Sequence, residues 1–97
     1  MSEPVIGNLR PHTWSSEESV AYEAAIEAIN GVVGAYSRLI ADAESRPGAE
    51  DEAAEYRRLR AACHQERRAL RAEDTEGVAR VRAAYAARLR DLTDTDA

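Results

Sequence analysis

Large apolar residues recur at alternating intervals of four and three between residues 16 and 45. The residues that keep this spacing are Tyr22, Ile26, Ile29, Val33, Tyr36 and Ile40, and Val32 and Leu39 widen the same face. A mean interval of 3.5 residues holds one side of an α-helix against a neighbouring helix, whereas a half-buried strand alternates every second residue. The spacing therefore predicts a long amphipathic helix and an all-α protein.

Local signals predict where this helix begins and ends. Ser15 and Glu18 form an S-x-x-E capping box, in which the hydroxyl and the carboxylate each accept a hydrogen bond from a free backbone N–H. Pro47 and Gly48 end the helix, because the residue before a proline disfavours helical backbone angles and glycine turns at little cost.

Two further helices follow this turn. A break at residues 73–77, with Asp74 or Thr75 as the cap, separates them. Apolar residues return at helical spacing on both sides of the break. The predicted helices span about 16–45, 49–73 and 76–92, and residues 94–97 form a frayed acidic tail.

These elements predict a small helical bundle, built on a long antiparallel helical hairpin plus a shorter third helix. A chain of 97 residues suits one domain, here residues 15–93. The expected core is Tyr22, Ile26, Ile29, Val33, Tyr36, Ile40, Tyr56, Leu59, Cys63, Leu70, Val78, Val81, Tyr85 and Leu89.

Residues 1–14 are expected to form an extended N-terminal arm. Pro4, Gly7 and Pro11 interrupt regular structure in it, but it also carries apolar residues, of which Trp14 is the best anchor. The other apolar residues of the arm are Val5, Ile6 and Leu9. We favour an arm that folds back along the bundle, and the alternative is an arm that orders only on binding a partner.

A stripe of small residues lies on the first helix opposite its large residues. Its members, the small-residue stripe, are Ala21, Ala24, Ala28, Gly31 and Ala35. A glycine inside a helix costs about 1 kcal/mol relative to alanine, so Gly31 needs a reason. Either the helix breaks at Asn30 and Gly31 in an alanine-rich sequence, or the other two helices sandwich the first. The third alternative is an interface with a second copy or a partner protein.

A second stripe, on the second helix, is basic. Its members, the basic stripe, are Arg57, Arg60, His64, Arg67 and Arg71. Guanidinium groups bind carboxylates and phosphates equally well, so the stripe could contact Glu23 and Glu27 of the first helix, an acidic protein or nucleic acid. We favour the intrachain contact, because the net charge of −5 disfavours nucleic acid.

The residues that could carry chemistry are few and poorly spaced. Cys63 and His64 are adjacent in a predicted helix, so their side chains diverge by about 100° and do not form a nucleophile and base pair. With His12 they are the only nitrogen or sulfur ligands, and they lack metal-site spacing. No glycine-rich phosphate loop is present. We expect neither an enzyme nor a bound metal or cofactor.

The composition of the chain indicates in which cellular compartment it is expected. No apolar run reaches the roughly 18 to 20 residues that span a bilayer, and the acidic start MSEPVIGNLR is unlike a signal peptide. One cysteine cannot form an intrachain disulfide. We therefore expect a cytoplasmic protein.

Elimination of catalytic and cofactor-binding classes leaves a protein–protein interaction or assembly module. We expect self-association, or docking of a protein partner, through the first helix and the arm. The alternative is a small regulatory protein that binds nucleic acid through the basic stripe.

Overall fold

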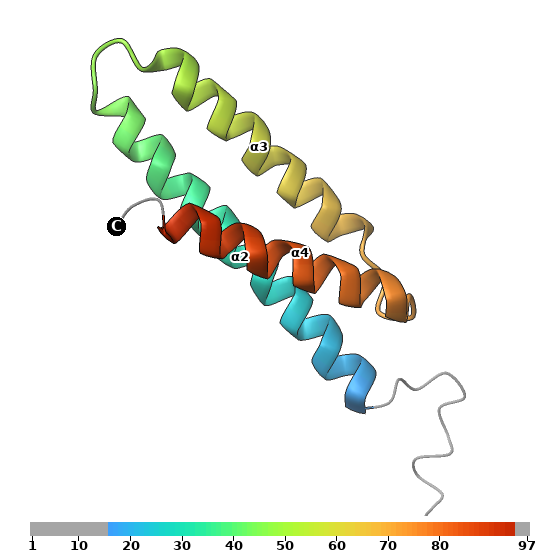
Figure 1. Ribbon diagram of the computed structural model, residues 1–97. Coiled ribbons are helices and arrows are strands. Elements are labelled where there is room, and N and C mark those ends of the chain that lie inside the picture. The colour runs from blue at the N-terminus through green and yellow to red at the C-terminus, as the bar shows by residue number, and fades with distance from the viewer. Residues whose placement is uncertain (1–15, 95–97) are drawn as a thin grey trace, which may run out of the picture.

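The computed structural model describes residues 16–94 and folds them into three helices. They are α2 (Ser16–Glu44), α3 (Glu50–Ala69) and α4 (Thr75–Asp94). Figure 1 shows α2 and α3 running antiparallel from the turn that joins them, with α4 lying across α2. The predicted all-α class and the hairpin with a third helix are confirmed. The predicted arm, Ser15 of the predicted capping box and residues 95–97 lie outside the described residues.

Helix α2 is the centre of the bundle. Both α3 and α4 pack along it, whereas no Cα atom of α3 lies within 8 Å of one in α4. A helix with neighbours on two sides buries two faces. The buried residues of α2 are Ala25, Ile29, Val32, Ala35, Tyr36, Ile40 and Ala43. Helix α2 is therefore the element that both other helices pack against, and it is continuous through Asn30 and Gly31, so the alternative of a break there is wrong.

Side chains from all three helices meet in one core. Ile29, Val32 and Tyr36 of α2 contact Cys63 of α3 and Tyr85 of α4. Four of these five residues belong to the predicted core. Of its other members, Ile40 and Val78 are buried, and the partly buried ones are Tyr22, Ile26, Val33, Tyr56, Leu59, Leu70, Val81 and Leu89.

The exception among the five is Val32, which is 0% exposed, whereas the predicted Val33 is only partly buried. Apolar residues at alternating intervals of four and three mark the face that a helix turns toward one neighbouring helix. Because α4 packs on a second side, the centre of burial moves around α2 by about one residue, from Val33 to Val32.

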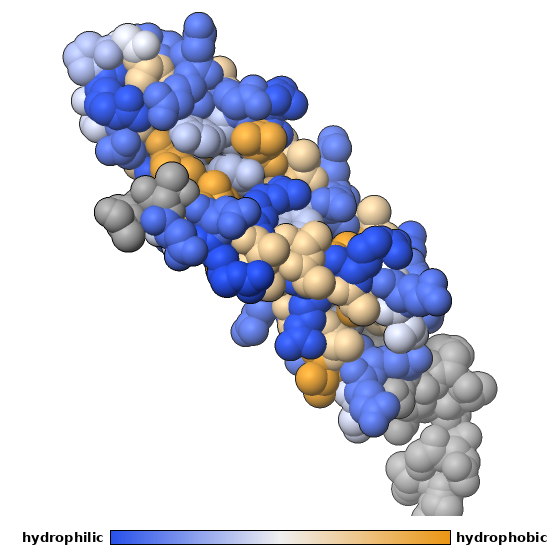
Figure 2. Space-filling view, in the orientation of Figure 1, coloured by the Kyte–Doolittle hydropathy of each residue, from blue (hydrophilic) through white to orange (hydrophobic). Residues whose placement is uncertain are grey.

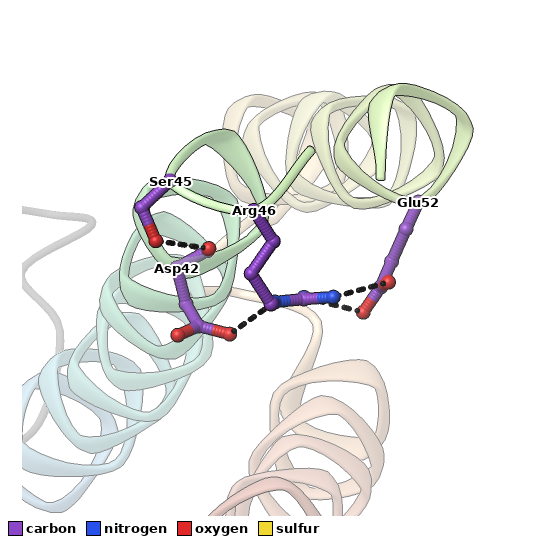
Figure 3. A network of polar contacts seen from close by, with 4 residues as sticks. All are labelled: Asp42, Ser45, Arg46 and Glu52. Carbon is purple, nitrogen blue, oxygen red and sulfur yellow. Dashed lines mark hydrogen bonds and ion pairs between the residues drawn. The ribbon is translucent and has the colours of Figure 1, made fainter. Parts of the chain in front are cut away.

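The turn between α2 and α3 is held by one arginine. Figure 3 shows Arg46 between two acids: its Nε lies 3.2 Å from Asp42 Oδ2, and its Nη2 lies 3.1 Å from Glu52 Oε2. Ser45 Oγ donates to the carbonyl oxygen of Asp42 over 2.7 Å. Gly48 has a φ of 84°, in the left-handed region that side chains disfavour, so glycine suits this position. The predicted turn is confirmed.

Helix α3 ends at Ala69, four residues before the predicted end. Leu70 leaves the helix with φ −70° and ψ 136°, and its side chain packs against the core. Asp74 caps α4, because the backbone N–H of Gly77 donates to its Oδ1 over 3.0 Å. Of the two predicted caps, Asp74 is therefore the one used, and Thr75 begins the helix.

Candidate interaction surface

An open groove follows the seam between α2 and α4. It consists of two hollows, which Arg82 joins because it lines both. The first hollow, about 340 Å³, is lined by Ser16, Glu17, Val20, Ala21 and Arg82. The second hollow, about 420 Å³, is lined by Ala24, Glu27, Ala28, Arg82, Ala86, Leu89 and Arg90. Figure 2 shows weakly hydrophobic surface over α4 and the adjoining part of α2, bordered by hydrophilic side chains. We call the two hollows together the seam groove.

Members of the small-residue stripe form the floor of this groove. Ala21, Ala24 and Ala28 line the hollows. At Gly31 the packing is tight, since a Cβ there would lie 3.0 Å from Leu89 Cδ2 of α4. Ala35 is 4% exposed. An intrachain contact with α4 therefore accounts for Gly31, and binding of another chain by the stripe stays a prediction.

The two rims of the seam groove carry opposite charges. Exposed Glu17 and Glu27 lie on α2, and exposed Arg82 and Arg90 lie on α4. None of their four side chains forms a hydrogen bond or an ion pair within residues 16–94. The groove therefore combines two unpaired acids from α2 with two unpaired arginines from α4.

Val20 gives the first hollow its most hydrophobic side chain. It is 64% exposed and is the one large hydrophobic residue in the described part of the chain that is exposed. Single exposed apolar residues are ordinary, so Val20 becomes a candidate contact residue only together with the alanines that line the same groove.

Sequence reasoning missed Val20, Arg82 and Arg90 as candidates. A usable signal existed on α4, where Arg82, Ala86 and Arg90 follow one another at intervals of four residues and so lie along one edge of a helix. Sequence alone could not show that this edge borders the alanines of α2, because that depends on where α4 packs.

The basic stripe lies along the contact between α3 and α2. Arg57 pairs with Glu44, and Arg60 Nη1 donates to Ser37 Oγ over 2.9 Å. Further along α3, Arg67 bonds Asn30 Oδ1, and its Nη2 donates to His64 Nδ1 over 2.7 Å. Four of the five members are therefore engaged within the chain, while Arg71 is exposed beyond the end of α3.

The prediction that the basic stripe contacts α2 within the chain is confirmed, but the predicted partners Glu23 and Glu27 are wrong. The antiparallel register places Asn30 beside Arg67, close to the end of α3 at Ala69. Earlier residues of α2, including both glutamates, lie beyond that end. Binding of nucleic acid or an acidic protein by the stripe stays a prediction.

A cluster of side chains bridges α3 and α4, although their backbones remain apart. The Tyr85 hydroxyl donates to a carboxylate oxygen of Glu66, and Arg88 lies over the Tyr85 ring with its Cζ 4.6 Å from the centroid. Arg88 Nη1 also lies 3.8 Å from Cys63 Sγ. Burial, and next the bond to Glu66, raise the pKa of the Tyr85 hydroxyl above its ordinary value. Tyr85 therefore stays protonated at neutral pH and holds α4 to α3.

Cys63 and His64, the adjacent pair on α3, do not act together. Cys63 is 0% exposed in the core, whereas the partly buried His64 contacts Arg67. Within residues 16–94 no three histidine, cysteine or acidic side chains gather closely enough to hold a metal ion. His12 and Trp14 lie outside the described residues.

None of the described helices has the length and apolar character needed to cross a membrane. No known protein family, curated protein or solved structure matches the chain.

Proposed function

We propose that this chain is a non-enzymatic assembly module that self-associates through the seam groove. The observation that carries the proposal is the opposite charge of its two rims, whose side chains have no ion-pair partner within residues 16–94. A surface that binds a copy of itself must be self-complementary about a two-fold axis. A groove with an acidic rim and a basic rim has this property.

Two copies related by such an axis bring the rims together in pairs. Glu17 and Glu27 of one copy face Arg82 and Arg90 of the other, and the same contacts repeat on the opposite side of the axis. The apolar floor and Val20 of both copies are then buried in the centre. An apolar centre inside a polar rim is the usual anatomy of a protein interface. Because exposed ion pairs contribute little, the rims set the orientation and the apolar centre supplies most of the affinity.

Charge reversal tests this arrangement directly. One variant carries Glu17→Arg and Glu27→Arg, and a second carries Arg82→Glu and Arg90→Glu. The mass of each is measured by sedimentation equilibrium over a wide concentration range. Each variant alone has rims of one sign and should be monomeric where the unmodified chain associates. An equal mixture should form a heterodimer, and the chain with all four changes should self-associate again.

A control variant carries Arg68→Glu on α3 and Arg71→Glu just beyond its end, which make the same charge change as Arg82→Glu and Arg90→Glu at exposed residues that do not line the groove. Its association should match that of the unmodified chain. The proposal fails if the unmodified chain remains monomeric at every concentration. It also fails if the reversed variants associate as well as the control, or if the mixture stays monomeric.

A further inference from the structure

We propose that the first hollow of the seam groove is the docking site for Trp14 of the same chain, so that the N-terminal segment, residues 1–15, covers the surface used for self-association. The docking itself stands on the described hollow. Its regulatory consequence rests on the proposed function. The N-terminal segment and a second copy of the chain therefore compete for the same groove.

The position of the hollow favours this occupant. Ser16, the first described residue, lines the first hollow, so the N-terminal segment joins the structure at its edge. Trp14 precedes Ser16 by two residues. A ligand tethered this closely has an effective concentration of about millimolar or higher, which even a weak contact can exploit.

The lining of the hollow suits an indole ring. The exposed side chain of Val20 and the methyl group of Ala21 offer apolar surface, and a buried tryptophan removes roughly 150 to 250 Å² from water. The guanidinium of Arg82 has no partner in the described chain, and a tryptophan face attracts a cation within about 6 Å. Trp14 is the only tryptophan of the protein.

The rest of the segment is long enough to reach the second hollow. The helical rise places Ala28 about 12 Å from Val20 along α2. Five extended residues, from Trp14 back to Leu9, span about 16 Å at roughly 3.3 Å per residue. Leu9 can therefore lie against Ala28 while Trp14 occupies the first hollow. A segment in this position covers the apolar floor that a second copy would bury.

Trp14 fluorescence in the full-length chain tests the docking, at a concentration low enough for a monomer. The emission should be blue-shifted relative to the same chain in concentrated urea. Val20→Asp should move it toward the unfolded value, and so should Arg82→Glu in a separate variant. The matched controls Ala41→Asp and Arg68→Glu, at exposed positions away from the groove, should leave it unchanged. Circular dichroism verifies that each variant keeps its helices.

Sedimentation equilibrium tests the regulation. Trp14→Ala should raise the self-association constant by about tenfold, because the second copy no longer competes with a tethered segment. Unshifted emission, or emission that responds equally to the controls, would overturn the docking. A blue shift that grows with protein concentration would assign Trp14 to the groove of a second copy and would also overturn it. Weaker association of Trp14→Ala would overturn the competition.

Failure of the proposed function gives a different pattern. If the unmodified chain and the equal mixture of the two charge-reversed variants both stay monomeric at every concentration, while emission still responds to Val20→Asp but not to Ala41→Asp, the docking of Trp14 stands and the assembly role fails.

Discussion

Adjacent valines on α2 provide a matched test of the three-helix packing. Val32→Ala and Val33→Ala make the same chemical change at neighbouring positions, of which Val32 is 0% exposed and Val33 is partly buried. Truncation at Val32 loses about 1.6 kcal/mol of transfer free energy for two methyl groups. The cavity adds about 1 kcal/mol, and the better helix propensity of alanine returns about 0.5 kcal/mol. The net cost should be about 2 kcal/mol.

Truncation at Val33 should cost far less. Because Val33 is partly buried, its truncation loses only about half of the transfer free energy, and water or neighbouring side chains fill the gap. The same gain in helix propensity applies, so the net loss of unfolding free energy is roughly 0.3 kcal/mol. The measurement is urea unfolding followed by far-UV circular dichroism, with an unchanged m-value as the control for a common denatured state. The melting temperatures should differ by about 7 to 14 °C. Equal costs, or a larger cost at Val33, would refute the position of α4 on the second side of α2.

Further changes test single contacts. Asp74→Ala should cost about 1 kcal/mol of unfolding free energy in urea, because it removes the α4 cap, whereas Thr75→Ala should cost almost nothing. Tyr85→Phe should cost about 1 kcal/mol at pH 8 and Tyr56→Phe little, because no hydrogen bond of the Tyr56 hydroxyl is present in the described structure. Folding raises the pKa of Tyr85, so its contribution is complete below about pH 10 and declines as the pH rises from there through the raised pKa of the folded state; unfolding curves of Tyr85→Phe should lack this part of the alkaline loss. Gly48→Ala should lower the melting temperature, since its positive φ costs a side chain roughly 1 to 2 kcal/mol.

The positions of the helices could be predicted because their signals are local. Pro47 and Gly48 end α2 at the expected turn, and Asp74 caps α4 as one of two expected residues. The end of α3 could not be predicted as well. Leu70 continues the apolar spacing of α3 because it also packs against the core, although its backbone has already left the helix. An apolar pattern reports burial, and burial continues past the end of a helix.

Pairing between helices was harder to predict than the helices themselves. The basic stripe was expected to contact glutamates of α2, but hydrogen-bonding side chains such as Ser37 and Asn30 are also among its partners. The register of α3 along α2 decides which side chains meet, and this register depends on the length of the turn and the packing of the core. Arg82 and Arg90 were not predicted as interaction residues, because only the packing of α4 on α2 places them beside the alanines of the groove.

The seam groove exists only while α4 is packed on α2. Because α4 makes no backbone contact with α3, it is held by its face on α2, including Leu89 against Gly31, and by the bridge from Tyr85 and Arg88 to α3. An occupant of the groove touches both helices and binds only the packed state. It must therefore stabilise the fold by an amount that grows with its concentration relative to its Kd. The N-terminal segment is attached to the chain and contributes at every dilution, whereas a second copy contributes only when the protein is concentrated. The melting temperature of the full-length chain should consequently depend on concentration more steeply once Trp14 is replaced by alanine.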